Sequence, residues 1–230
     1  MHIVLIFSTM SLILEVSGFI FTLGGWVIVG ATLSNSYWKV STVFGNVITT
    51  STLYENLWHS CAEESTGISN CKAFNSLLAL PAFIQACRAL MITSLVLGMG
   101  GTLLALLGLK CTQIGSNDER TKARISIMSG MVFILAGLSS MVALSWYAAN
   151  ITAEFFDPLY AGTKYELGYA LYLGWAGSLL SIVGGMLLTW SSCKGNQRDH
   201  GYHYAASATV NEPQIYIKQA ETVTPAKDYV

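Results

Sequence analysis

The chain has 230 residues, of which 53% are hydrophobic and only 11% are charged, and its formal net charge at pH 7 is −1. Soluble domains carry roughly 25% charged residues, so this composition excludes an ordinary soluble domain and indicates a membrane protein. The net charge near zero also gives no basis for nucleic-acid binding.

The N-terminal part predicts a first membrane-spanning helix. Residues 16–38 contain no charged side chain, and roughly 20 apolar residues are enough to cross a bilayer. The apolar residues before this stretch lack the basic region and cleavage site of a secretory signal, so they are interpreted as an extension of the span. The start residue of the protein is either Met1 or Met10. Glu15 is expected at the cytoplasmic interface, because an isolated carboxylate in lipid is unfavourable.

The segment after the first span changes to a pattern typical of β-strands. β-branched residues and threonine dominate, and Phe44-Gly45-Asn46 reads as a turn between two such runs. We expect four antiparallel strands here, at 37–43, 47–52, 53–61 and 70–74.

Three more uncharged stretches predict three more spans. They cover 89–109, 125–153 and 167–193, so both termini are expected on the same side of the membrane. Basic residues concentrate between the second and third spans and after the fourth span, which places that loop and both tails in the cytoplasm. Between the third and fourth spans, Pro158 is expected to end the helix, and 164–167 to return as an edge strand.

These stretches divide the chain into nine segments. They are an apolar extension at 1–9, a first span at 10–31, a first extracellular segment at 32–86, a second span at 87–109, a cytoplasmic loop at 110–124, a third span at 125–148, a second extracellular segment at 149–167, a fourth span at 168–191 and a polar, disordered cytoplasmic tail at 192–230.

The five cysteines separate by compartment. Cys61 and Cys71 lie outside, where oxidation is favoured, and a disulfide between them would stabilise a small sheet by about 2–4 kcal/mol. Cys87 is expected to be a buried apolar side chain. Cys111 and Cys193 lie at cytoplasmic span ends, where they are either palmitoylated or free thiols.

The sequence gives no indication of an enzyme, a metal site or a cofactor. The four histidines are dispersed, no nucleophile stands beside a base, and no glycine-rich phosphate loop follows a strand.

Several motifs together resemble the claudin family of tight-junction proteins. Its signature is a tryptophan, a Gly/Asn-Leu-Trp triplet and two cysteines, and the resemblance extends through most of the membrane region. It is closest to the branch that contains claudins ten and fifteen. The residues that carry it are Trp38, Asn56-Leu57-Trp58, Cys61, Cys71, 84–91 with Arg88, 155–160 and 164–168.

The resemblance implies a fold of class membrane α+β. This is a left-handed bundle of four transmembrane helices under an extracellular antiparallel sheet of about five strands. Leu57 and Trp58 are expected to insert where the sheet meets the outer leaflet, with Trp38, Asn56 and Arg88 completing the signature that seats the sheet.

The resemblance also implies side-by-side polymerisation with itself and other claudins, and adhesion across the intercellular gap. Leu77 would enter a pocket of the neighbouring subunit formed by Phe155, Phe156 and Leu167. The alternative is that these aromatic residues pack their loop onto the sheet of the same molecule. The terminal Asp228-Tyr229-Val230 fits a PDZ groove, which implies binding to junctional scaffold proteins.

Paracellular pores between the sheets would conduct Na⁺ and K⁺. Glu64 matches the pore-lining acidic position of the cation-conducting members. Glu55 and Glu63 add negative charge, whereas Lys39 and Lys72 oppose it. Ala73, where that branch has an acidic residue, weakens the expected selectivity, and a solvated loop is the alternative interpretation of the two adjacent glutamates.

The sequence therefore predicts a tight-junction claudin of the plasma membrane that forms a cation-permeable paracellular channel. The alternatives are a barrier and adhesion claudin without conductance, and an auxiliary channel subunit of the related tetraspan superfamily.

Overall fold

The computed structural model describes residues 2–41, 51–64, 66–74, 80–109, 119–159 and 162–210, with side chains described throughout these ranges except at 2–9, 11, 119 and 194–210. The chain divides into two compact units, Met1–Asn196 and Gln197–Val230. The first unit contains the helix bundle and the sheet, and the second is helical as far as Val210.

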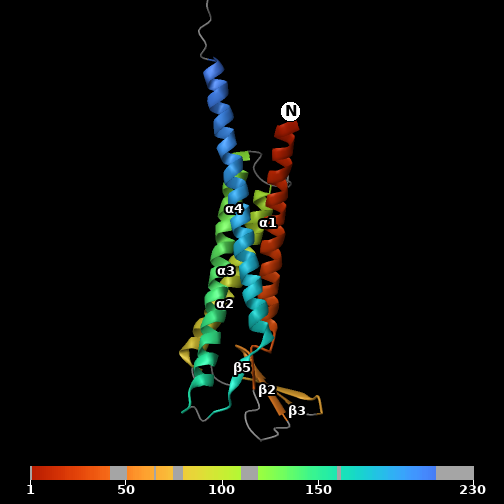
Figure 1. Cartoon of the computed structure of the whole chain (residues 1–230), viewed down its shortest axis with the longest axis vertical. Helices are drawn as coiled ribbons and strands as arrows, with labels where there is room; N and C mark the ends of the chain where they lie inside the picture. The colour runs from red at the N-terminus through yellow and green to blue at the C-terminus, as the bar shows by residue number, and fades with distance from the viewer. Residues whose placement is uncertain are drawn as a thin grey trace, which may run out of the picture. The chain divides into compact units, whose positions relative to one another are not determined.

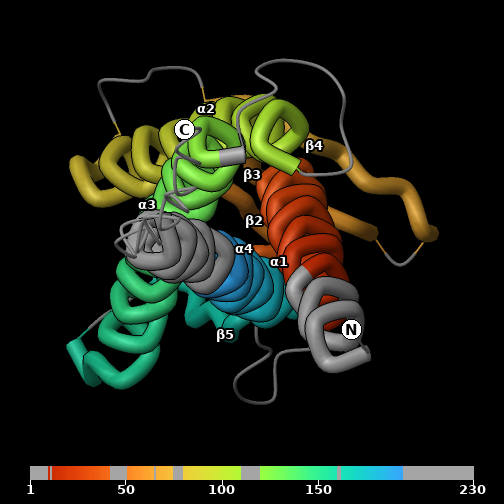
Figure 2. Tube along the Cα trace, turned by 90° about the horizontal axis from the view of Figure 1, so that it is seen from above, coloured from red at the N-terminus to blue at the C-terminus, as the bar shows by residue number. Residues whose placement is uncertain are grey.

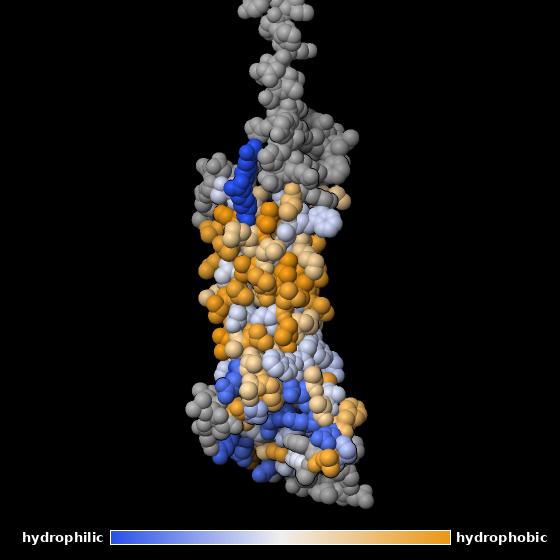
Figure 3. All heavy atoms as spheres, turned by 90° about the vertical axis from the view of Figure 1, so that its left-hand side faces the viewer, coloured by the Kyte–Doolittle hydropathy of each residue, from blue (hydrophilic) through white to orange (hydrophobic). Residues whose placement is uncertain are grey.

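Four long helices form the bundle (Figures 1 and 2). They are α1 (His2–Ser34), α2 (Ala82–Gly108), α3 (Glu119–Phe156) and α4 (Tyr169–Val210). All four are long and apolar enough to cross a membrane. On the face shown in Figure 3, hydrophobic side chains cover the middle of the bundle, and hydrophilic ones gather at the sheet end. The four predicted spans are confirmed.

The residues before Met10 continue directly into α1, as expected for an extension of the first span. Two other helix boundaries differ from those expected, and the first is that of α3, which runs on to Phe156 before the turn at Pro158. The expected disordered tail from 192 is wrong as far as Val210, because α4 continues to that residue. Residues 192–210 contain no proline, which would have interrupted the helix.

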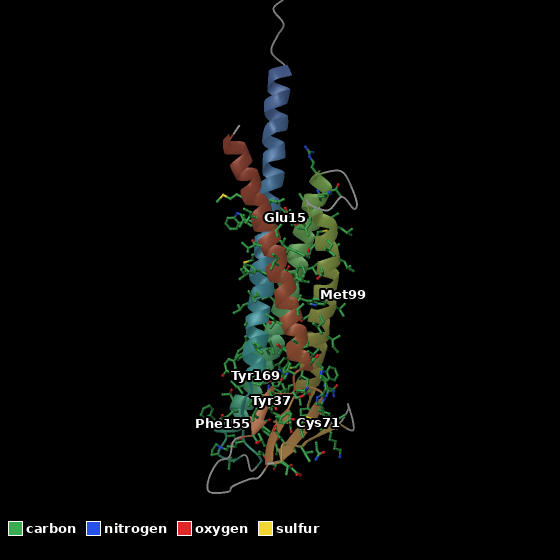
Figure 4. All side chains as sticks on the ribbon, turned by 90° about the vertical axis from the view of Figure 1, so that its right-hand side faces the viewer. Glu15, Tyr37, Cys71, Met99, Phe155 and Tyr169 are labelled. Carbon is green, nitrogen blue, oxygen red and sulfur yellow. A yellow bond between two sulfur atoms is a disulfide. The ribbon has the colours of Figure 1, made fainter. Side chains whose placement is uncertain are left out.

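Polar side chains inside the bundle donate to backbone carbonyls of neighbouring helices. The Trp26 indole donates to the Leu95 carbonyl at 3.1 Å, and the Ser94 hydroxyl to that of Ala136 at 2.8 Å. Such bonds satisfy polar groups that lipid could not. Glu15 lies toward the end of the bundle away from the sheet (Figure 4) and is buried among the helices.

The sheet has five antiparallel strands in the order β4-β3-β2-β1-β5. This confirms the predicted combination of a four-helix bundle and a five-stranded sheet. The strands are β1 (Lys39–Ser41), β2 (Ser51–Glu55), β3 (His59–Glu64), β4 (Ser69–Ala73) and β5 (Tyr165–Leu167).

The predicted continuous strand at 53–61 is wrong, because a turn divides it. The Asn56 side-chain oxygen accepts hydrogen bonds from the backbone N–H groups of Trp58 and His59, at 2.7 and 2.8 Å. Asparagine favours turns through such side-chain bonds to its own backbone. β2 therefore ends at Glu55, and the turn at 44–46 with most of the expected strand at 47–52 lies outside the described residues.

The predicted edge strand of the second outer segment is confirmed. β5 pairs with β1 in the register Lys39↔Leu167. The N–H of Gly168 then donates to the Trp38 carbonyl at 2.8 Å. A Cβ on Gly168 would collide with the Tyr37 carbonyl, so only glycine fits this junction between β5 and α4.

Candidate functional site

The strand register sorts the charged side chains onto two faces of the sheet. Residues directly opposite in neighbouring strands share a face, and successive residues alternate between faces. One set, here called the lysine face, is Lys39, Glu55, Ser60, Glu64 and Lys72. The other set, here called the disulfide face, is Tyr54, Cys61, Glu63 and Cys71. The two adjacent glutamates of β3 therefore point to opposite sides.

An ion pair fills the part of the lysine face nearest the helices. The Lys39 ammonium lies 2.7 Å from a Glu55 carboxylate oxygen, and each side chain is 18% exposed. The Ser60 hydroxyl donates to Glu55 at 2.9 Å and the Tyr165 hydroxyl at 3.2 Å. Lys39 also lies 4.2 Å from the centre of the Tyr165 ring. We expected Lys39 to oppose the negative charge of the whole segment, and in the fold it does so by pairing directly with Glu55.

Glu64 lies at the far end of β3, where the chain turns into β4. Its N–H donates to the Ile68 carbonyl at 3.1 Å, and its carbonyl accepts from Gly67 at 2.9 Å. Gly67 adopts a φ of 79°, which glycine tolerates best. The Glu64 side chain is exposed, and within the described ranges it forms no ion pair. It is therefore a carboxylate open to solvent.

The disulfide face carries an aromatic stack that the sequence did not reveal. Tyr37 stacks on Tyr54 with ring centres 4.4 Å apart and on Tyr169 at 5.4 Å. Burial, followed by the negative charge of Glu63, raises the pKa of Tyr37. The three tyrosines come from different parts of the chain, so only their shared aromatic character could have suggested the stack.

The Cys61–Cys71 disulfide is confirmed, and it joins directly opposite residues of β3 and β4. Cys61 is buried, whereas every residue of β4 is exposed. In Figure 4, Cys71 and Phe155 lie on opposite sides of the sheet end, in agreement with the strand order.

The signature residues come together where the sheet meets the bundle. Trp38 is fully buried, and its indole donates to the Thr32 carbonyl at 2.8 Å. The Arg88 guanidinium donates to the Leu57 carbonyl at 2.6 Å and lies 4.8 Å from the centre of the Trp58 ring. Leu57 is 0% exposed, so it packs inside the protein, whereas we expected it to insert into the outer leaflet.

The structure brings the three predicted pocket residues to one cavity of about 310 Å³. Phe155 and Phe156 come from the end of α3, and Leu167 from β5. The Lys164 ammonium donates to the Phe155 carbonyl at 3.0 Å and so joins the residue before β5 to the end of α3. The cavity is lined by Ile151, Thr152, Phe155, Phe156, Tyr165, Glu166, Leu167 and Tyr172.

The remaining predicted residues lie either outside the described ranges or away from the sheet. Leu77, Cys111 and the terminal Asp228-Tyr229-Val230 lie outside the described residues. Cys193 is an exposed free thiol, and Cys87 is buried and donates to the Ala143 carbonyl at 3.4 Å. Within the described ranges, no three His, Cys, Asp or Glu side chains group as metal ligands would.

Comparison with known proteins gives one consistent result. A model of the PMP-22/EMP/MP20/Claudin family matches residues 8–188. Claudin-15 of Mus musculus is 55% identical over 190 residues, which is 83% of this chain and 84% of that protein. Claudin-10 of Bos taurus is 47% identical over 214 residues, which is 92% of each chain.

Proposed function

This chain belongs to the PMP-22/EMP/MP20/Claudin family, and we propose that it is a tight-junction claudin that forms a cation-permeable path between epithelial cells. Membership of the family makes it a structural membrane protein rather than an enzyme. The observation that supports cation permeation is the solvent-exposed carboxylate of Glu64 on the lysine face.

The charges that oppose Glu64 are offset or distant. Lys39 is paired with Glu55. Lys72 lies opposite Ser60, four positions along β3 from Glu64, which corresponds to roughly 13 Å. Physiological salt screens exposed charges beyond about 8 Å. A cation beside Glu64 is therefore attracted by this carboxylate with little opposition.

One carboxylate attracts a monovalent cation in water by only about 1 kcal/mol at 4 Å. In a polymeric pore several copies of Glu64 would converge, and low-dielectric walls would concentrate their field. Preference for Na⁺ or K⁺ over Cl⁻ is therefore proposed as a property of the assembly, with weak selectivity for a single chain.

The two adjacent glutamates provide a matched test. In an epithelial layer with little claudin of its own, Glu64→Gln should lower the Na⁺ to Cl⁻ permeability ratio measured by dilution potentials. Glu63→Gln removes the same charge from the disulfide face and should change the ratio less. Equal changes of the permeability ratio in the two variants would contradict a pore on the lysine face. If the unmodified protein instead raises the electrical resistance of the layer without any ion preference, it is a barrier claudin.

For lateral assembly, we propose that Leu77 of one subunit enters the 310 Å³ cavity of the next. The supporting observation is that Phe155, Phe156 and Leu167 line this one cavity and that Phe156 is 75% exposed. Leu77→Ala should reduce strand continuity in freeze-fracture replicas. Ile68→Ala removes an exposed aliphatic side chain from the turn between β3 and β4 and serves as the control. If the freeze-fracture strands are equally continuous in the two variants, the proposal is contradicted.

The proposal includes cytoplasmic termini and binding of junctional PDZ scaffolds by Asp228-Tyr229-Val230. Basic residues in the loop at 110–124 support the orientation through the positive-inside tendency. The order of an acidic, an aromatic and an aliphatic residue in Asp228-Tyr229-Val230 supports the PDZ interaction, because a PDZ groove binds such C-terminal peptides by strand addition. A peptide of these residues should bind a junctional PDZ domain, and its amidated form should not.

A further inference from the structure

A second and much smaller cavity lies between the sheet and the outer end of α3. Its volume is about 20 Å³. We propose that it binds one ordered water molecule, which connects the Tyr147 hydroxyl to polar side chains of β2 and α3. The lining residues are Lys39, Glu55, Asn56, Phe74, Phe83, Ile84, Tyr147, Asn150, Ile151 and Glu154.

The Tyr147 hydroxyl is the group that needs a hydrogen-bond partner in this cavity. The side chain is only 3% exposed, and its ring is fixed edge-on to Trp38, with ring centres 5.2 Å apart. The hydrogen bonds among the residues that the structure describes include none of the Tyr147 hydroxyl, and this hydroxyl is not one of the fully buried polar atoms that lack a partner, so water can reach it. Buried tyrosine hydroxyls normally have a hydrogen-bond partner, and here the lining of a polar cavity is where that partner would be found.

The size and chemistry of the cavity suit a single water. A water needs roughly 10–15 Å³ of such volume and two to four polar partners. Beyond Tyr147, the cavity offers the Glu154 carboxylate and the Asn150 amide from α3 and the Glu55 carboxylate from β2. One water could accept from the tyrosine and donate to two of these oxygens.

The charges favour water over a bound cation. The Lys39 ammonium lies in the same lining and already neutralises Glu55 at 2.7 Å. A metal ion in a cavity of this size would stand close to that ammonium, whereas a neutral water meets no such repulsion. The inference does not depend on the proposed function, because it concerns how α3 is joined to the sheet.

The variant Tyr147→Phe should change the Tm in opposite directions, depending on whether a water occupies the cavity. If a water bridges the hydroxyl, its removal loses a hydrogen bond and should lower the Tm of the full chain in detergent by about 2–4 °C. If the hydroxyl is buried without a partner, its removal relieves a desolvation penalty. An unchanged or higher Tm would therefore overturn the proposal. Tyr172→Phe removes a hydroxyl from a tyrosine that is 57% exposed and serves as the matched control.

The identity of the occupant is tested separately. The Tm of the unmodified chain should be the same in sodium chloride and choline chloride, and a map at a resolution that shows ordered waters should contain one peak beside the Tyr147 hydroxyl. A Tm that depends on sodium would overturn the water in favour of a cation. An empty cavity in such a map would overturn binding altogether.

Discussion

The two ends of the sheet are held in different ways. At the end nearest the helices, here called the root, Trp38 and Leu57 are completely buried and Arg88 links the turn to α2. At the other end, here called the tip, the β3–β4 hairpin carries Glu64, and every residue of β4 is exposed. The root is stabilised by packing, whereas the tip depends on strand pairing and one disulfide. The charge at the tip can therefore change without disturbing the fold.

The largest effect is expected from breaking the root. Trp38→Ala removes a fully buried side chain and its hydrogen bond to Thr32, and should destabilise the protein by about 3–5 kcal/mol. Thermal unfolding in detergent would measure this. Trp146→Ala removes a tryptophan that is 46% exposed and should lower the Tm far less. Similar losses in the two variants would contradict the role of packing at the root.

Removal of the disulfide should loosen the tip alone. The double variant Cys61→Ser/Cys71→Ser should cost about 2–4 kcal/mol and speed hydrogen exchange in β4. Exchange in β1, which belongs to the root, should remain slow. Cys193→Ser removes an exposed free thiol and is the control. Faster exchange over the whole sheet would show that the two ends are not independent.

An intermediate effect is expected from the ion pair at the root. Glu55→Gln leaves the Lys39 ammonium without its carboxylate, and should destabilise the protein by about 1.5–3 kcal/mol. It should also lower the cation preference, because a positive charge is released. The double variant Lys39→Met/Glu55→Gln should restore the preference in dilution-potential measurements. Failure to do so would place Glu55 among the groups that meet the ion.

The smallest effect is expected from Lys72→Ala on β4, where Lys72 lies opposite Ser60 and away from Glu64. Lys72 is exposed and forms no ion pair with a described residue, so stability should change by less than about 0.5 kcal/mol. The Na⁺ to Cl⁻ permeability ratio should rise slightly. An increase as large as the loss in Glu64→Gln would show that the two charges act at closer range than the sheet register suggests.

The sequence predicted the large elements because their signals are strong and local. Uncharged runs identified four spans, and the signature residues identified the root and the disulfide. The turn at Asn56 was missed because the apolar and aromatic residues on both sides of it suggest a continuous strand, and they conceal a side chain that bonds to the following backbone. The partners of Glu55 were missed because Tyr165 is 110 positions away and only tertiary folding brings it near.

Leu167 lines the 310 Å³ cavity and also pairs with Lys39 in the sheet. A side chain that occupied the cavity would press on the same short strand that is bonded to β1. Mechanical load from a neighbouring subunit would then pass through backbone hydrogen bonds into the remaining strands. In the proposed assembly, three residues of β5 would thus connect the contact between molecules to the shape of the lysine face.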